Sequence, residues 1–133
     1  MKSLQAIIVA DCFNSKFGPL NNPEEDCPLC LFDVANVPTL HYIIEFLISN
    51  NVNEIIIPSK SNKDRIEELS MKYKYKAKIN VVGTQLDSNT LGGQLREIAE
   101  MKLIQDDFIV VRGDIITNID LSAAFKMHYY VKM

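Results

Sequence analysis

Apolar positions along the chain follow two patterns, a continuous run typical of a buried strand and a 3.6-residue repeat typical of a helix. Leu4–Ala10 is a nearly continuous apolar run, which favours a strand buried on both faces. Further strands are predicted over Glu54–Pro58, Lys78–Val82 and Phe108–Val111. Because a helical pattern separates successive strands, the sequence predicts a three-layer, doubly wound α/β fold with a mainly parallel sheet.

The first helix is predicted between Pro38, which suits a first helical turn, and Asn50–Asn51. Its apolar positions recur at i, i+3, i+4, i+7 and i+8, so they form one face. These positions are Leu40, Ile43, Ile44, Leu47 and Ile48. The second helix is predicted over Ser61–Tyr73, with its first residue and Asp64 as an N-terminal cap.

Two further helices are predicted, the third opening with Gly92-Gly93 and the fourth capped by Asn118 or Asp120. The third has apolar positions at Leu91, Leu95, Ile98 and Met101, and the fourth carries Leu121, Ala124, Phe125 and His128. The sequence stops at Met133 within this last pattern, after only four predicted strands. Such a sheet would expose an edge that intact folds usually pair, so we expect a fragment or an N-terminal half-domain.

The loop after the first strand, Ala10–Leu20, has the position of a phosphate-binding loop but few of its residues. Glycines let backbone N–H groups close around a phosphate there, and a following helix adds its positive end. Here Asp11 supplies a carboxylate instead, which at ~4 Å would repel a phosphate charge by roughly 1–4 kcal/mol. The loop is therefore predicted to bind phosphate poorly.

Two other segments could contribute chemistry at the same place. If the first strand neighbours the fourth, the loop faces Arg112-Gly113-Asp114 across a crevice of the kind where doubly wound folds bind ligands. Asp114 could hold Mg²⁺ beside substrate phosphates, but we favour a role in capping the turn. Gly92-Gly93 could admit a base or ribose against the backbone, or let the helix pack closely on the sheet, and both remain open.

Composition bounds the class of protein. The 133 residues are 47% hydrophobic with a formal net charge of -3, which indicates one globular unit whose surface as a whole is not built to attract nucleic acid or anionic membranes. No apolar run approaches the ~20 residues that span a bilayer. We therefore expect an intracellular, cytoplasmic chain. Its cysteines, Cys12, Cys27 and Cys30, lack a clear fourth zinc ligand, so free thiols are favoured over a metal site.

One local patch is basic. Its lysines are Lys72, Lys74, Lys76 and Lys78, and they alternate with Tyr73, Tyr75 and Ala77. The pattern could contact RNA phosphates and stack bases. We favour instead the solvated end of a helix that leads into an edge strand, where lysines discourage aggregation.

The order of motifs resembles that of the sugar-nucleotide pyrophosphorylases, which have the nucleotidyltransferase fold. Their opening pattern L-A-G-G-x-G-T-R-L-x-P-L and their second motif P-K-P-L-L-P-V-A-N-K-P both keep their frame here. The matching residues are Ala10, Lys16, Pro19, Leu20, Pro28, Leu31, Val34, Ala35, Asn36 and Pro38. Asp11 and Cys12 replace the paired glycines and Asn14 the third, while Leu29 stands where those enzymes have a substrate-binding lysine.

These departures are similar to those of the epsilon subunits of eukaryotic translation initiation factor 2B. The similar stretches are ADCFNSKFGPL, VANV, YIIEFL, LGGQLR and RGDIITNI, in register from about Leu4 to His128. The resemblance implies that residues 1–133 are the N-terminal portion of a nucleotidyltransferase-like domain. In that family a hexapeptide-repeat β-helix and a C-terminal exchange domain follow, and neither has a counterpart in these 133 residues.

The resemblance also implies a site and partners. It implies a degenerate nucleotide pocket with no catalytic residue and no cofactor, formed by Asp11, Cys12, Asn14, Lys16, Leu29, Gly92, Gly93 and Asp114. The expected task is assembly and regulation of a complex that exchanges GDP for GTP on initiation factor 2. The expected partners are the other subunits of factor 2B, especially gamma, and factor 2 itself. The alternative is an active pyrophosphorylase that uses Asp114 for Mg²⁺ and Lys16 for phosphate.

Overall fold

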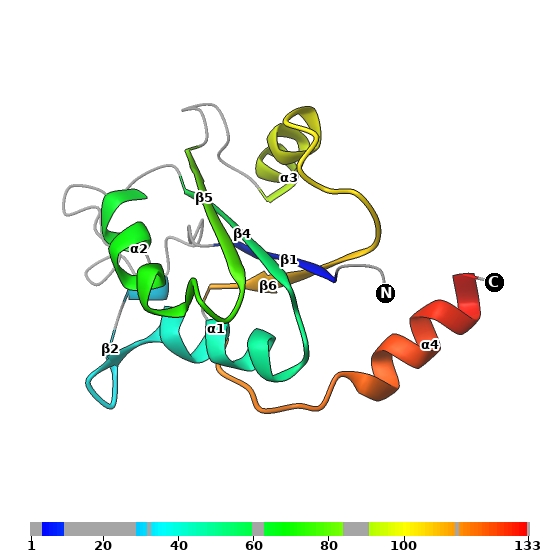
Figure 1. Cartoon of the computed structure of the whole chain (residues 1–133), viewed down its shortest axis with the longest axis horizontal. Helices are drawn as coiled ribbons and strands as arrows, with labels where there is room; N and C mark the ends of the chain where they lie inside the picture. The colour runs from blue at the N-terminus through cyan, green and yellow to red at the C-terminus, as the bar shows by residue number, and fades with distance from the viewer. Residues whose placement is uncertain are drawn as a thin grey trace.

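A parallel four-stranded sheet, in the order β5-β4-β1-β6, forms the centre of the molecule (Figure 1). The computed structural model describes residues 4–9, 29–31, 33–59, 63–83, 91–113 and 115–132. The strands are β1 (Gln5–Val9), β4 (Glu54–Ser59), β5 (Lys78–Gly83) and β6 (Phe108–Arg112). All three neighbouring pairs run parallel, which confirms the predicted doubly wound sheet.

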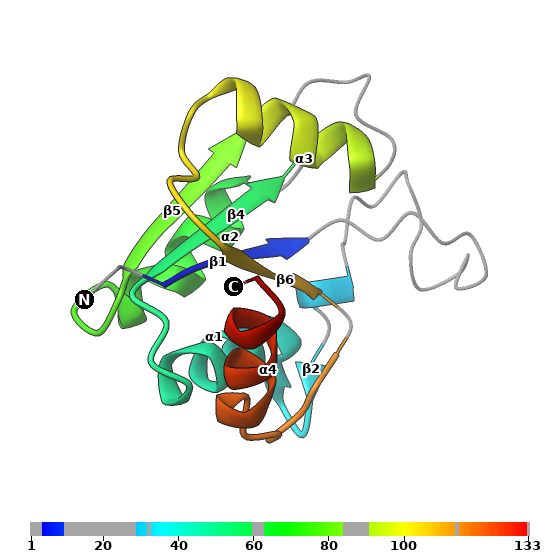
Figure 2. The ribbon, with the colours of Figure 1, turned by 90° about the vertical axis from the view of Figure 1, so that its right-hand side faces the viewer.

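Helices cover both faces of this sheet (Figures 1 and 2). α1 (Thr39–Ser49) and α2 (Lys63–Ser70) pack on one face, where they bury the larger apolar core. α3 (Leu91–Glu100) packs on the other face, against a smaller cluster around Ile7 and Ile56. β1 is buried at every position, as its continuous apolar run predicts for a central strand.

A short hairpin before α1 was not predicted. Its strands are β2 (Asp33–Val34) and β3 (Val37–Pro38), joined by Ala35 and Asn36, whose φ angles are 53° and 62°. Two consecutive left-handed residues give the tight turn that matches strand twist, and glycine usually occupies one of them. The absence of glycine here hid the hairpin signal. Pro38 therefore ends β3 and precedes α1 as its N-cap, instead of lying in the first helical turn as predicted.

The second and third helices differ from the prediction at their ends and on their buried face. The α-helix α2 ends at Ser70, whose hydroxyl donates to the Glu67 carbonyl at 2.9 Å, and the chain continues as the 3-10 helix η3 (Met71–Tyr73). The expected cap at Ser61 lies outside the described residues. In α3 the apolar Leu91 is exposed, whereas Gln94 is buried beside Ile98. Met101, one of the apolar positions that predicted this helix, follows its last residue and is exposed.

The last helix, α4 (Ser122–Lys132), touches the rest of the molecule at few points. Asp120 accepts the Ser122 N–H at 3.0 Å, a bond that lowers the pKa of Asp120, so Asp120 and not Asn118 caps the helix. Phe125 is half-buried, Ala124 is exposed, and His128 pairs with Asp107 at 3.2 Å. No helix in the described part of the chain is long and apolar enough to cross a membrane.

Candidate functional site

β1 and β6 lie side by side, as the crevice prediction requires. Ile7 pairs with Val110 and Val9 with Arg112, and the Gly113 N–H donates to the Val9 carbonyl at 2.8 Å. Chain order jumps between these two strands, so their carboxyl ends mark the switch point of the sheet. The N-terminal end of α3 lies over this same end (Figure 2).

The structure places three of the eight predicted pocket residues. Leu29 begins the 3-10 helix η2 (Leu29–Leu31), directly before Cys30, a buried cysteine of the larger core. Gly92 is exposed in the first turn of α3, and a methyl group on its Cα would meet no atom within 4 Å. Close packing on the sheet therefore does not explain Gly92. Gly93, the next residue, is half-buried.

The remaining pocket residues lie outside the described part of the chain: Asp11, Cys12, Asn14, Lys16 and Asp114. Their arrangement stays a prediction. Among the residues that the structure does describe, no group of three His, Cys, Asp or Glu side chains could hold a metal ion.

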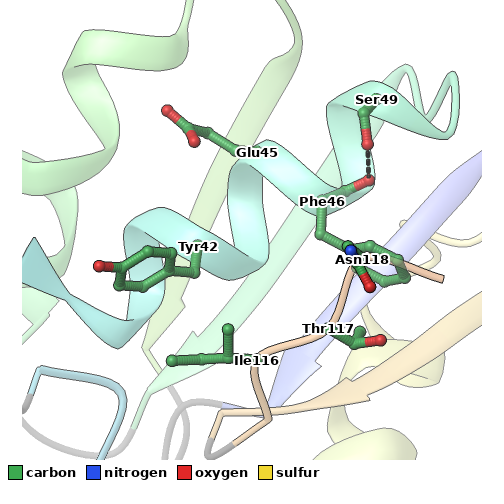
Figure 3. Close-up of a pocket in the computed structure, with 7 residues that line it drawn as sticks. All are labelled: Tyr42, Glu45, Phe46, Ser49, Ile116, Thr117 and Asn118. Atoms are coloured by element: carbon green, nitrogen blue, oxygen red, sulfur yellow. Dashed lines mark hydrogen bonds between the residues drawn. The ribbon is translucent and has the colours of Figure 1, made fainter. Parts of the chain in front are cut away.

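A groove that sequence reasoning did not find lies on the outer side of α1 (Figure 3). It encloses about 570 Å³ and is lined by Tyr42, Glu45, Phe46, Ser49, Ile116, Thr117 and Asn118. The α1 residues recur at helical spacing, and the extended segment after β6 supplies the opposite wall. Because that segment meets α1 only through the tertiary fold, no motif could have signalled the groove.

One polar cluster joins α1 to η3. His41 Nδ1 lies 2.9 Å from the Tyr73 hydroxyl, which donates to Glu45 Oε1 at 3.3 Å, so Nδ1 is the protonated nitrogen in this arrangement. Burial and the charge of Lys72 lower the pKa of His41, against the opposing effect of Glu45. Burial and Glu45 raise the pKa of Tyr73. A neutral imidazole that ties two elements together agrees with the structural role predicted for His41.

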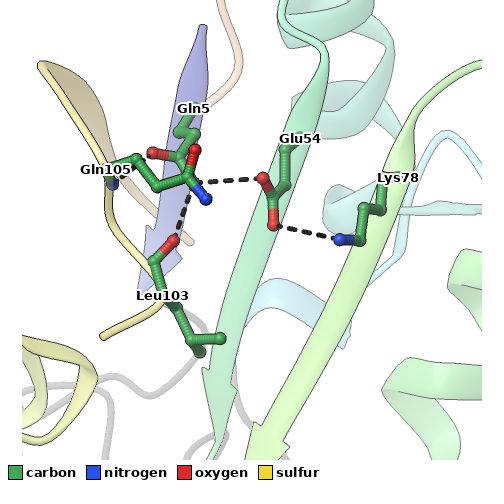
Figure 4. A network of polar contacts seen from close by, with 5 residues as sticks. All are labelled: Gln5, Glu54, Lys78, Leu103 and Gln105. Carbon is green, nitrogen blue, oxygen red and sulfur yellow. Dashed lines mark hydrogen bonds and ion pairs between the residues drawn. The ribbon is translucent and has the colours of Figure 1, made fainter. Parts of the chain in front are cut away.

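A second polar cluster crosses the sheet at its amino end, opposite the switch point (Figure 4). The buried Gln5 side chain donates to Glu54 Oε2 at 3.0 Å and to the Leu103 carbonyl at 2.8 Å, and it accepts the Gln105 N–H at 2.9 Å. Lys78 lies 3.9 Å from Glu54. These bonds fasten the segment before β6 to the centre of the sheet. Sequence reasoning missed this role because Gln5 lies inside an apolar run.

Exposed apolar side chains gather in the last part of the described chain. We call these residues together the apolar flank, and they are Phe108, Val110, Ile115, Ile116, Ile119, Met127, Tyr129, Tyr130 and Val131. They lie on β6, on the segment after it and on α4.

Comparison of the fold with solved structures defines the class. The chain superposes on HddC from Yersinia pseudotuberculosis with a TM-score of 0.75 and 22% identity, over 92% of this chain and 53% of that one. A UDP-glucose pyrophosphorylase gives a TM-score of 0.74 at 13% identity, over 98% of this chain and 56% of that one. The chain therefore has the nucleotidyltransferase fold of the sugar-nucleotide pyrophosphorylases.

Within that class the sequence is similar to translation initiation factor eIF2B subunit epsilon. Identity is 34% with the Schizosaccharomyces pombe protein and 30% with that of Dictyostelium discoideum, over 95% and 94% of this chain. This confirms the expected resemblance. The chain spans only 19% and 18% of those two relatives. A UTP–glucose-1-phosphate uridylyltransferase from Synechocystis is 24% identical over 94% of this chain and 34% of its own length. No protein-family model matches the chain.

Proposed function

We propose that this chain acts in translation initiation as a non-catalytic nucleotidyltransferase-like segment of a guanine-nucleotide exchange factor subunit, of the eIF2B epsilon type. Its task on this proposal is assembly and regulation of the cytoplasmic complex that serves initiation factor 2. Its partners are the other subunits of that complex, with gamma as the particular expectation, and factor 2. It supplies no catalytic residue and requires no cofactor.

The observation that carries the proposal is the alignment with two epsilon subunits at 30% and 34% identity over nearly the whole chain, against 24% for the uridylyltransferase. The residue types at the pocket support the non-catalytic part. Asp11 and Cys12 replace loop glycines, and Leu29 replaces a lysine. A carboxylate in the loop repels a phosphate group, and a leucine, unlike the lysine that it replaces, cannot neutralise the charge of the phosphate.

The exposed apolar side chains of the apolar flank support an assembly role, because such side chains are stabilised when another protein surface covers them. We also propose that residues 1–133 correspond to the N-terminal portion of a nucleotidyltransferase-like domain. The supporting fact is that this chain spans 53% and 56% of solved chains with the same fold.

A segment exchange tests the proposal in a working complex. In the S. pombe epsilon subunit the aligned segment is replaced by this chain, and co-purification with the other subunits and GDP release from factor 2 are measured. We expect the chimera to assemble and to keep exchange activity. The matched control inserts the aligned segment of the Synechocystis uridylyltransferase, which should not assemble. A chimera that is expressed and folded but does not co-purify would contradict the proposal.

The second candidate is an active pyrophosphorylase, favoured by the open space at Gly92 and by Asp114, two residues after the end of β6 in the sequence. Titration with nucleoside triphosphates in the presence and absence of Mg²⁺ separates the two functions. We expect no metal-dependent binding and no pyrophosphate release with sugar phosphates. Tight Mg²⁺-dependent binding that disappears in Asp114→Ala would favour the pyrophosphorylase.

A further inference from the structure

The turn between η3 and β5 presents lysines and one aromatic ring to solvent. We call it the lysine flank and define it by Lys72, Lys74, Tyr75, Lys76 and Lys78. All four lysines are exposed, and Tyr75 is 79% exposed. The neighbouring Tyr73 and Ala77 point inward and are buried, so the alternation in sequence becomes a separation of charged and apolar sides.

Protection of an edge strand explains only part of this surface. Lys78 is the first residue of β5 and lies 3.9 Å from Glu54, so both the edge and a carboxylate account for it. Lys72, Lys74 and Lys76 precede the strand, and none forms an ion pair with a carboxylate in the described part of the chain. A cation at a helix end accounts for Lys72, which lies in the last turn of η3. Neither reason accounts for Tyr75 and Lys76.

Tyr75 and Lys76 form a combined unit. The Lys76 ammonium lies 5.5 Å from the centroid of the Tyr75 ring, so positive charge and an aromatic face are presented together. An exposed ring flanked by lysines has the two features that bind a single-stranded nucleic acid: a surface for stacking a base and cations for the adjacent phosphates. Acidic proteins and lipid headgroups offer charge but no base to stack on the ring.

We propose that the lysine flank binds single-stranded RNA, with one base stacked on Tyr75 and phosphates held by Lys72, Lys74 and Lys76. The flank lies at the amino end of β5, whereas the predicted nucleotide pocket lies at the carboxyl ends of the strands. The inference is therefore independent of the pocket and goes beyond the proposed function. It revises the expectation, drawn from the net charge of the whole chain, that nucleic acid is not a partner.

Fluorescence anisotropy with a labelled oligouridine of about 12 nucleotides tests the proposal on the full chain. Three phosphate contacts predict a slope of about −2 for the logarithm of affinity against that of salt concentration, between about 50 and 200 mM. Tyr75→Ala should weaken binding about 5- to 150-fold and leave the slope unchanged, since only stacking is lost. The double variant Lys74→Glu with Lys76→Glu should abolish binding and flatten the slope.

The control variant is Lys126→Glu, the same charge change at an exposed lysine of α4, which should leave binding unchanged. Circular dichroism checks that each variant folds. Tyr75→Phe, which keeps the aromatic ring, should retain most of the affinity of the unchanged chain. Three results would overturn the proposal. The first is no binding of the oligouridine at low salt, and the second is a loss of affinity in Lys126→Glu as large as that in the lysine-flank variants. The third is binding that inorganic polyphosphate displaces and that Tyr75→Ala does not weaken. The third result would indicate a surface that binds anions without recognising RNA.

Discussion

Rows of side chains run across the sheet from one edge strand, β5, to the other, β6. Two of these rows end in polar side chains on β5 and in apolar side chains on β6. One row across the α3 face of the sheet runs Asn80, Ile56, Ile7 and Val110, and the row beside it runs Lys78, Glu54, Gln5 and Phe108. On β5 the rows end in an amide and an ammonium. On β6 they end in Val110 and Phe108, which are 41% and 42% exposed.

Because of this difference, we expect the two edges of the sheet to have different surroundings. A lysine on an edge strand keeps the strand in water and discourages pairing with another chain. β6 has no lysine or proline, and the helix that follows it exposes Met127, Tyr130 and Val131 on one side. The β5 edge is therefore suited to solvent and charged ligands, and the β6 edge to cover by protein.

The largest effect is expected when Gln5, in the row that runs Lys78, Glu54, Gln5 and Phe108, is replaced. Gln5→Ala removes two hydrogen bonds that join the sheet to residues 103–105 and one to Glu54 within the sheet, and it leaves their part-buried polar partners unpaired. We expect the free energy of unfolding to fall by about 2–4 kcal/mol, measured by urea denaturation. In the control Gln105→Ala only an exposed side chain is lost, so stability should change by less than about 0.5 kcal/mol. A loss below about 1 kcal/mol for Gln5→Ala would mean that water replaces these bonds.

The second prediction exchanges the character of the two edges. Val110→Lys places on β6 the charge that β5 already has, so any self-association of the chain through the β6 edge should weaken about tenfold, equivalent to about 1.4 kcal/mol. Sedimentation velocity over a range of concentrations measures it. Asn80→Lys, in the same row at the other edge, is the matched control and should leave association unchanged. Equal effects of the two substitutions would show that net charge matters and not the edge.

A smaller effect is expected where α4 is attached. The Asn50 side chain accepts the Leu121 N–H at 2.9 Å and donates to the Phe46 carbonyl at 2.9 Å, so it ties the end of α1 to the start of α4. Asn50→Ala should lower hydrogen-exchange protection in α4 about fivefold, corresponding to about 1 kcal/mol, with little change elsewhere. Asn53→Ala, a nearby exposed asparagine, is the control. Unchanged exchange in α4 would indicate that its apolar contacts suffice.

The smallest effect concerns His41, whose imidazole contacts the buried Tyr73 next to the lysine flank. The pKa of His41 is lower in the folded chain than its ordinary value of 6.5, so the unfolded chain binds the proton more tightly. Stability should therefore fall as pH decreases from about 6.5 towards the folded-state pKa. His41→Gln should remove this part of the pH dependence, measured by urea denaturation at several pH values. The same substitution at the exposed His128 is the control, and an unchanged slope in His41→Gln would reject the role of this imidazole.

Much of the fold was predictable from local pattern. Each predicted strand agrees with its observed bounds to within one residue among the described positions. For β1 and β4 the reason is that a central parallel strand must be apolar on both faces. The β2–β3 hairpin and the buried Gln94 were missed, since left-handed Ala35 and a polar residue in a helix core have no local signal. Of the pocket, the neighbouring strands and the open Gly92 can be checked, while the Asp11 loop stays a prediction.

By itself the sequence determined the order and type of the sheet strands and the α-helices, the parallel sheet, and the resemblance to the epsilon subunits, because these depend on residue type and spacing along the chain. Only the tertiary structure decided the register of the strands. That register makes Lys78 and Phe108 opposite ends of one row, and the turn before β5 buries Tyr73 while exposing Tyr75. Such properties arise from pairing between residues far apart in sequence, and a local pattern contains no information about which distant residue each one meets.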